Sequence, residues 1–239
     1  MNSLPLWLTA ESPCGYFDDR SSQSLVADPQ FPLDSSVYAQ LLALGFRRSG
    51  NQVYRPHCAN CAACVPTRIP VNLFRADRKQ RRCAKYNLRT RVLIKDAKFD
   101  ERHFELYRRY QIARHGKQDA DDIDREDFLQ FFLSDWCNTW FVEFLIEGHL
   151  AAIAVVDHFD RALSAVYTFF DPAFNRYSPG IYAVLWQIDE AKRRGMDYVY
   201  LGFWIADCRK MQYKIQYQPL SGLIGDQWQT LSTTQTNED

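Results

Sequence analysis

The sequence has no long hydrophobic run. None of its apolar segments approaches the roughly 20 residues that a helix needs to cross a bilayer. The N-terminus also lacks the basic start and apolar centre of a secretory signal. We therefore expect a cytoplasmic protein without membrane contacts. The seven cysteines, an odd number, then indicate reduced thiols or metal ligands rather than a disulfide framework.

The chain also lacks net charge, so its overall composition favours no charged partner. The charges are nevertheless unevenly distributed. Nine Lys and Arg residues lie between Arg75 and Lys95 against one acid, Asp77, whereas residues 119–127 hold six acids against one arginine. A charge run is often a solvated surface. The alternative for the basic run is that it binds a polyanion such as RNA, because clustered Lys and Arg neutralise phosphates.

Residues 1–72 are rich in turns, and we expect them to form a cysteine-containing N-terminal region with one evident helix over 34–45. Residues 73–239 have longer periodic segments. They predict, in order, a basic helix (74–89), a strand (91–99), two helices (100–115 and 125–136), three strands spaced as an antiparallel meander (139–146, 149–159 and 162–170), a helix (177–195) with Ser178 as N-cap, and a strand (197–204).

This order predicts an α/β (α+β) fold and is similar to that of acetyltransferase-like (GNAT) domains. Ordinary GNAT domains hold a pyrophosphate on a glycine-rich loop before the corresponding helix. Here that segment reads "FNRYSPG" and contains one glycine, Gly180, so an enzyme that uses acetyl-coenzyme A is poorly supported. A likeness in element order alone does not indicate a function.

Three cysteines recur at a spacing of three in "HCANCAAC", namely Cys58, Cys61 and Cys64. With Cys14 as a fourth ligand, this spacing is typical of part of a zinc or iron–sulfur site. The alternative is that reduced thiols simply pack a loop beside a binding site.

Five segments resemble the arginyl-tRNA–protein transferase family, and most closely its bacterial branch, the aspartate/glutamate leucyltransferases. They are "SPCGYF", "GFRRSGNQVYRPHCANCAACVPTRIPV", "RKQRRCAKYN", "YRRYQIARH" and "YSPGIYAVLWQIDEAKRRGMDYVYLGFWIADCRKMQYKIQYQPL". They occur in the same order as in the family and extend from about residue 13 to residue 220. Eukaryotic members pair a Cys-x-x-Cys with a later Cys-Cys. Phe17 and Ala63 replace one cysteine of each pair here, so a metal would need Cys58 and Cys61 instead.

The resemblance implies transfer of an amino acid from a charged tRNA to the α-amine of a protein that begins with Asp or Glu, which marks that protein for degradation in an N-degron pathway. The compact length and the cysteine segment favour leucyl-tRNA as donor, with arginyl-tRNA as the alternative. The chemistry requires no cofactor, because the ester is already activated and an α-amine has a pKa of about 7.7 to 8. Holding the reactants together and stabilising the oxyanion is then the main task.

The matched segments imply the site residues, although a single arginine is more often a surface residue and Ser178 can be a plain cap. The substrate-binding candidates are Arg47, Arg48, Tyr54, Arg55, Arg68, Gln111, His115, Gly180 and Lys214. Arginines suit the acceptor carboxylate because their planar fork grips it with two bonds.

The tRNA-binding candidates are Arg78, Lys79, Arg81, Arg82 and Lys85, and the acidic stretch 119–127 is expected to lie away from the tRNA. Ser178 and Tyr182 are the catalytic candidates, because a helix N-terminus favours developing negative charge. No nucleophile–base motif is evident, so no catalytic base is assigned. A metal-dependent RNA-binding module without turnover is the alternative from another class.

Overall fold

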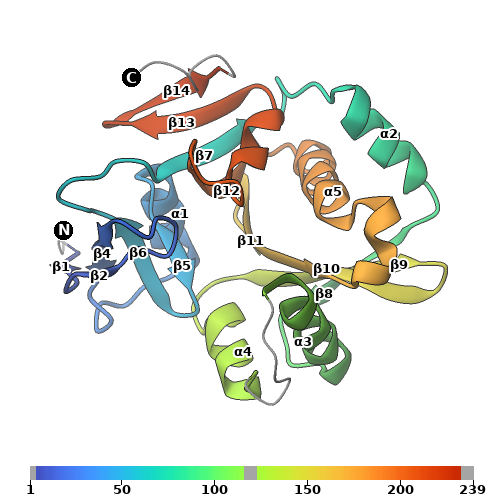
Figure 1. The fold of residues 1–239 in the computed structure, drawn as a ribbon, viewed down its shortest axis with the longest axis horizontal. Helices are drawn as coiled ribbons and strands as arrows, with labels where there is room; N and C mark the ends of the chain where they lie inside the picture. Colours follow the sequence, from blue (N-terminus) through green and yellow to red (C-terminus); the bar gives the residue numbers. More distant parts are fainter. Residues whose placement is uncertain (1–3, 116–122, 233–239) are drawn as a thin grey trace.

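Residues 4–115 and 123–232 are described by the structure, a computed structural model (Figure 1). Its centre is a mixed sheet of eight strands in the order β14-β13-β7-β12-β11-β10-β9-β8. These strands are Val65–Pro70 (β7), Arg91–Asp96 (β8), Thr139–Ile146 (β9), His149–His158 (β10), Ala162–Phe170 (β11), Tyr198–Trp204 (β12), Leu220–Ile224 (β13) and Gln227–Leu231 (β14). The predicted mixed α/β class is confirmed.

A smaller four-stranded sheet, in the order β1-β4-β6-β5, is built by N-terminal residues at the left of Figure 1. Its strands are Leu6–Leu8 (β1), Ser24–Ala27 (β4), Arg47–Ser49 (β5) and Gln52–Pro56 (β6), and a short ladder joins Ser12–Pro13 (β2) to Ser21–Ser22 (β3). The sequence did not reveal these strands, because two to five residues show too little alternation. Helix α1 (Ser35–Ala43) was predicted, and the Asp34 carboxylate caps it by accepting the Val37 amide at 2.8 Å.

Helices cover both faces of the large sheet (Figure 1). Helices α2 (Arg78–Tyr86) and α5 (Pro179–Arg193) lie on one face, and α3 (Glu101–His115) and α4 (Arg125–Phe132) lie on the other. Each face has its own buried apolar cluster. Two short 3₁₀ helices, η2 (Pro172–Tyr177) and η3 (Gln212–Gln216), follow β11 and β12.

The antiparallel meander predicted for residues 139–170 is confirmed by the β9–β10 and β10–β11 ladders, and the helix predicted over 177–195 is confirmed as α5. The boundary predicted at residue 72 does not separate two sheets. Strand β7 lies between β13 and β12 in the large sheet. Strand β13 pairs with β7 only at Thr67 and Arg68, so Pro66 and Pro70 flank the part of β7 that is paired on both sides.

A buried ion pair joins the two sheets. Arg48 of β5 donates from Nε to Asp157 Oδ2 (2.8 Å) and from Nη2 to Asp157 Oδ1 (2.5 Å), and both side chains are fully buried. The Thr139 hydroxyl also donates to Asp157 Oδ1, at 2.8 Å. Burial acts against the charge of Arg48, but the attraction and hydrogen bonds of Asp157 outweigh it and raise the Arg48 pKa. The Arg48 side chain, which was predicted to bind substrate, is therefore engaged by Asp157 in the interior of the protein.

Candidate active site

The two parallel strands of the large sheet separate along their length. Strands β11 and β12 pair only from Ala162–Tyr198 to Ser164–Tyr200. Beyond that point β12 remains paired with β7 as far as Trp204, and β11 remains paired with β10 as far as Phe170. We call the region where these two strands part, between residues 165–170 and 201–204, the strand fork.

Arg47 enters the strand fork from β5. Its guanidinium donates from Nη1 to Ser164 Oγ (2.9 Å) and from Nη2 to the Ala165 carbonyl oxygen (2.5 Å), both on β11. On the β12 side it lies against Gly202, where a Cβ would be 3.6 Å from Arg47 Nε. Gly202 has a φ of +76°, which favours glycine, and it follows the bulge at which β12 shifts register against β7. Arg47 thus contacts both strands that border the strand fork, β11 and β12.

Lys214 of η3 lies on the β12 side of the strand fork. Its side-chain ammonium donates to the Phe203 carbonyl oxygen and lies 3.6 Å from Met211 Sδ, and the residue is 5% exposed. Burial lowers the pKa of Lys214 to about 7, and repulsion by Arg47 contributes to this shift, while the Cys208 and Cys64 thiols oppose it. Near neutral pH this lysine is therefore divided between its charged and neutral forms.

The two cations of the strand fork have no acidic partner within residues 4–115 and 123–232. Arg47 is bonded to a hydroxyl and a carbonyl, and Lys214 to a carbonyl, whereas the other buried arginine, Arg48, has the Asp157 carboxylate. Buried charges normally acquire an opposite charge. The arrangement is suited to an anionic group that arrives with a ligand.

Aromatic side chains border the strand fork. Tyr54 pairs with Arg47 across the β5–β6 ladder, and its ring centroid lies 6.2 Å from that of Phe203. Burial raises the pKa of Tyr54 against the opposing effect of Arg47. Tyr213 of η3 is 43% exposed. Burial raises the pKa of Tyr213 and Tyr110 adds to the effect, while the positive charges of Arg114 and Arg47 oppose it.

On the β11 side, Gln111 of α3 is buried and donates from Nε2 to the Tyr167 hydroxyl at 3.3 Å. This contact lies on the face of β11 covered by α3, beside the strand fork. His115 ends α3, and its side chain lies outside the described residues, as do residues 116–122 of the acidic stretch. The described remainder of that stretch begins α4, on the face opposite α2 (Figure 1).

The start of α5 differs from its predicted form. Ser178 is the N-cap residue, as predicted, but it has a left-handed backbone (φ 51°, ψ 57°) and its side chain makes no capping bond. A Cβ on Gly180 would meet Phe170 at an ordinary 3.6 Å, so close packing does not require glycine there. The Tyr182 ring packs edge-on to Phe144 of β9, at 5.7 Å, within the apolar layer and not at the strand fork.

Two of the candidate arginines are used elsewhere. Arg55 donates to the Leu44 carbonyl oxygen at 2.9 Å. The Arg68 guanidinium is sandwiched between the rings of Tyr198 (3.8 Å) and Trp228 (4.1 Å). Arg47 is thus the member of the predicted arginine group that reaches the strand fork.

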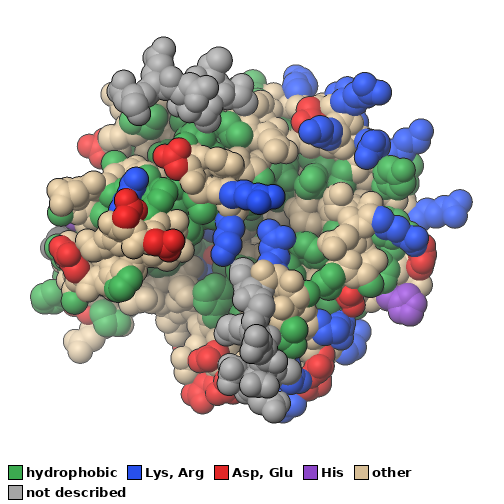
Figure 2. Space-filling view, viewed as in Figure 1, with side chains coloured by type: hydrophobic (Ala, Val, Ile, Leu, Met, Phe, Trp, Pro, Cys, Tyr) green, Lys and Arg blue, Asp and Glu red, His purple; other side chains and the backbone are tan. Residues whose placement is uncertain are grey.

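The predicted tRNA-binding residues lie together on α2. Asp77 and Gln80 form a capping box at its start, and Gln80 and Cys83 face the core. All five predicted residues are exposed: Arg78, Lys79, Arg81, Arg82 and Lys85. Figure 2 shows Lys and Arg side chains gathered at the upper right, over α2, and further ones near the centre of the same face.

The basic helix adjoins the start of α5. Asn87, the C-cap of α2, donates from Nδ2 to the Tyr177 carbonyl oxygen at 2.8 Å, and the Cys83 thiol donates to the Ser178 carbonyl oxygen at 3.7 Å. A nucleic acid on α2 would therefore lie next to the end of β11 and the opening of the strand fork.

The four predicted metal-ligating cysteines line a cavity of about 170 Å³, together with Tyr16, Phe17, Tyr54 and Phe203. The backbone amide of Ala63 and the Arg20 side chain, 3.4 Å from Cys61 Sγ, lower the pKa of Cys61, while burial opposes them. Burial raises the pKa of Cys64 to about 12, and the neighbouring thiols add to this shift. The lining thiols thus have very different acidities.

The sulfur positions do not form a compact tetrahedral zinc site. Zinc–sulfur bonds of about 2.3 Å place the sulfurs of a tetrahedral site about 3.8 Å apart. Among the described residues, the one group of three or more ligand side chains whose ligand atoms all lie within 4.8 Å of one another is Asp100, His103 and Glu143, which contains no cysteine. This arrangement does not support a preformed zinc site at Cys14, Cys58, Cys61 and Cys64. An iron–sulfur site there, whose cysteines would bind different irons and lie farther apart, stays a prediction.

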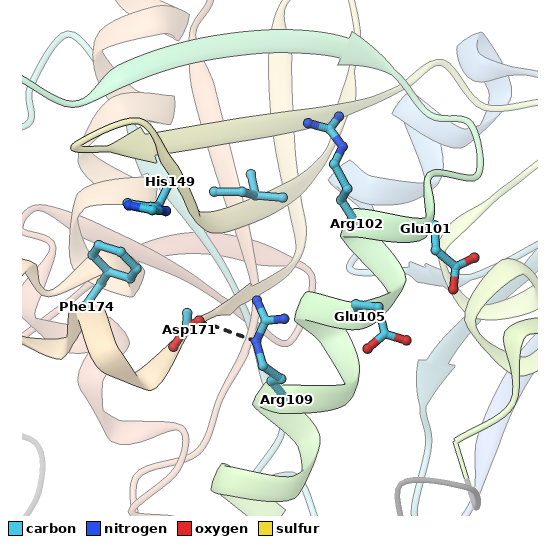
Figure 3. Close-up of a pocket in the computed structure, with 8 residues that line it drawn as sticks. Glu101, Arg102, Glu105, Arg109, His149, Asp171 and Phe174 are labelled. Atoms are coloured by element: carbon cyan, nitrogen blue, oxygen red, sulfur yellow. Dashed lines mark ion pairs between the residues drawn. The ribbon is translucent and has the colours of Figure 1, made fainter.

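A second, wider cavity of about 520 Å³ lies between α3 and the β9–β10 turn (Figure 3). Arg102 and Arg109 of α3 border it, with His149 and Phe174 on the opposite side, and Arg109 pairs with Asp171 at 3.4 Å. The Arg102 side chain pairs with carboxylates outside the lining, Asp100 (2.6 Å) and the buried Glu143 (3.2 Å). A cation therefore already neutralises the group of Asp100, His103 and Glu143.

Comparison with known proteins identifies the class of protein to which this fold and site belong. Residues 12–82 match the family model described as "Arginine-tRNA-protein transferase, N terminus", and residues 102–224 match the model of its C terminus. The chain belongs to the arginine-tRNA-protein transferase family. The resemblance found in the sequence is confirmed.

Similar relatives within this family are named aspartate/glutamate leucyltransferase. Those of Pseudomonas putida (strain GB-1) and Pseudomonas entomophila are 47% identical to this chain over 229 residues, covering 96% of it and 97% of each relative. That of Marinobacter nauticus is 42% identical over 233 residues, covering 98% of both chains.

Likenesses to solved structures are weaker. The C-terminal domain of a lysylphosphatidylglycerol synthetase from Agrobacterium fabrum has a TM-score of 0.44 at 9% identity, covering 72% of this chain and 53% of that chain. A related protein from Bacillus licheniformis has a TM-score of 0.40 at 12% identity, covering 71% and 49%. Neither supplies a fold assignment, and the GNAT-like fold stays a prediction. Within the described ranges, no helix has the length and apolar character to span a bilayer.

Proposed function

We propose that this protein transfers leucine from leucyl-tRNA to the α-amine of proteins that begin with Asp or Glu, in the cytoplasm, as a step of an N-degron pathway. The observation that carries this proposal is the 47% identity over nearly the whole chain to proteins named aspartate/glutamate leucyltransferase. The strand fork supports it, because two buried cations without an acidic partner suit an acceptor that brings its own carboxylate.

In this proposal the strand fork binds the first residue of the acceptor. Its side-chain carboxylate contacts Arg47 and Lys214, which directs the neighbouring α-amine to the leucyl ester. The neutral amine attacks the ester carbonyl, a C–N bond forms, and the bond from the carbonyl carbon to the ribose oxygen breaks. The amine loses a proton, and the tRNA leaves with a free hydroxyl. Because the ester is already activated, orientation supplies much of the rate.

The pH dependence of kcat/KM for an Asp-starting peptide is expected to be bell-shaped, with its maximum between about pH 7 and 8. The acceptor α-amine must be neutral, so the rate rises as pH passes its pKa of about 7.7 to 8. Lys214 must be charged to attract the carboxylate, and with its pKa lowered to about 7 it loses its proton as pH rises. Initial rates from pH 6 to 9.5, corrected for spontaneous deacylation, measure the curve. With Lys214→Arg the high-pH limb is expected to disappear, since arginine stays charged; an unchanged limb contradicts this role.

The exposed basic face of α2 is proposed to bind the tRNA, leading its 3′ end past the start of α5 to the strand fork. Replacing Arg78 and Arg82 by Gln is expected to weaken leucyl-tRNA binding and to reduce the slope of log Kobs against log salt by about one for each lost phosphate contact. Filter binding at several salt concentrations measures both quantities. Arg125→Gln, on α4 at the opposite face, is the matched control; an equal effect there would indicate nonspecific attraction.

Arginyl-tRNA is the alternative donor, since the family models carry that name. A metal-dependent RNA-binding module without turnover is not favoured, because the identity to named transferases extends through both regions of the chain. The direct test is to incubate the protein with leucyl-tRNA and a peptide that begins with Asp, and to detect the leucine-extended peptide by mass spectrometry. An unextended peptide would overturn the proposal.

A further inference from the structure

We infer that the cavity lined by the four cysteines receives the leucyl side chain of the donor and selects leucine by its uncharged lining. This inference rests on the proposed function and adds how the amino acid is chosen.

The lining of the cavity is uncharged. Tyr16, Phe17, Tyr54 and Phe203 form its aromatic part, and the remaining wall consists of the thiols, serines and other uncharged residues. None of these lining residues contributes a carboxylate, guanidinium or ammonium group. The Arg20 guanidinium is not part of the lining but contacts two lining residues, Cys61 Sγ at 3.4 Å and the Phe17 ring at 4.1 Å. An arginyl side chain would bring its charge there without an acid to pair with, which costs several kcal/mol. A leucyl side chain has no such requirement.

The size of the cavity fits leucine. Its volume is about 170 Å³. For comparison, an apolar cavity of about 150 Å³ in another protein holds benzene, which has six carbons. The isobutyl group of leucine has four carbons, so it fits without rearrangement.

The position of the cavity places the reacting carbonyl beside the strand fork. Tyr54 and Phe203 both line the cavity. Phe203 also belongs to the strand fork, where its carbonyl oxygen accepts from the Lys214 ammonium, and Tyr54 borders the fork opposite Arg47. A leucyl group in the cavity therefore has its ester directed towards the acceptor residue held by Arg47 and Lys214. The two substrates occupy adjacent sites of opposite character, one uncharged and one cationic.

The strand fork is the better place for the acceptor, because it offers two buried cations, Arg47 and Lys214. The cation beside the cavity, Arg20, is 41% exposed and already contacts Cys61 and Phe17. Among the described residues, no three cysteine sulfurs lie close enough together for a tetrahedral zinc site. The sulfurs act in this arrangement as the polarizable, weakly polar wall of a hydrophobic cavity.

The test compares one tRNA charged with leucine, alanine or phenylalanine, using an Asp-starting peptide as acceptor. Cys64→Phe narrows the cavity and is expected to lower the ratio of kcat/KM for leucine to that for alanine at least tenfold. Cys64→Ala widens the cavity and is expected to raise the ratio of kcat/KM for phenylalanine to that for leucine roughly tenfold. Ser24→Leu, on strand β4, narrows the same cavity from another side. Ala59→Phe is the control, because Ala59 is exposed in the cysteine segment and does not line the cavity. Donor ratios on one protein sample are unaffected by partial loss of folded protein.

Donor ratios that move in these two directions support the inference. Three results would overturn this inference while leaving the proposed function intact, provided that the unsubstituted protein transfers leucine. The first is an equal loss of rate with every donor, as a required metal at the cysteines would give. The others are a change of acceptor preference instead of donor preference, and donor ratios that stay constant. Failure of the unsubstituted protein to transfer leucine at all would overturn the proposed function as well.

Discussion

Lys214→Met is expected to lower kcat/KM for leucine transfer to an Asp-starting peptide by roughly 10²- to 10³-fold. Methionine keeps the length and apolar packing of the side chain but removes the ammonium that would face the acceptor carboxylate. Truncating one partner of a buried charge pair typically costs about 2 to 5 kcal/mol, and Lys214 is 95% buried beside Arg47. Initial rates with saturating leucyl-tRNA measure the loss.

The control for this prediction is a peptide that begins with Asn in place of Asp. The unsubstituted protein is expected to prefer Asp strongly, whereas Lys214→Met is expected to lose most of this preference, because Arg47 is then the remaining contact of the carboxylate. The Kd for leucyl-tRNA is expected to stay the same. A Lys214→Met protein that keeps its preference for Asp over Asn would show that the carboxylate is recognised elsewhere.

Asp157→Asn is expected to lower the free energy of unfolding by about 3 to 5 kcal/mol. The change leaves the fully buried Arg48 guanidinium without its counterion, and an unpaired buried charge is among the most destabilising changes in a protein core. Urea unfolding followed by circular dichroism measures the effect through the midpoint of the transition. Loss of the Arg48–Asp157 ion pair also weakens the connection between the small sheet and β10. Arg47, which belongs to the same strand β5, is therefore expected to leave the strand fork at lower denaturant concentrations than in the unsubstituted protein.

A matched surface pair provides the control. Arg161 and Asp197 also form two hydrogen bonds, at 2.8 and 2.7 Å, but the Arg161 side chain is 70% exposed. Asp197→Asn is therefore expected to change the unfolding free energy by no more than about 1 kcal/mol. Equal effects of the two substitutions would contradict the view that burial makes the Arg48–Asp157 pair important.

The neighbouring residues Arg47 and Arg48 show where sequence reasoning stops. Both were predicted to bind substrate, because they lie in one matched segment. They belong to a strand of three residues, and successive strand residues point to opposite faces, so Arg47 enters the strand fork while Arg48 enters the interior. A strand this short leaves no periodic pattern, and the Asp157 partner is 109 residues away in the sequence. The direction of each arginine therefore required the structure.

Longer elements were predictable for the opposite reason. The meander and α5 have enough residues for their hydrophobic pattern to be evident, and their ends have the expected turns. The cysteine spacing predicted ligands, yet whether the sulfurs meet depends on β4, β6 and β7, which bring distant segments around one cavity. The buried state of Lys214 likewise depends on η3 folding against the end of β12. Local spacing does not contain that information.

The measurement that tests the central claim most directly crosses two donors with several acceptors. Leucyl-tRNA and arginyl-tRNA, each carrying a radiolabelled amino acid, are incubated with the protein and with peptides that begin with Asp, Glu, Lys or Arg. We predict labelled leucine on the Asp and Glu peptides, none on the Lys and Arg peptides, and little transfer from arginyl-tRNA to any of them. Efficient use of arginyl-tRNA, or leucine transfer to the Lys and Arg peptides in place of the acidic ones, would contradict the account.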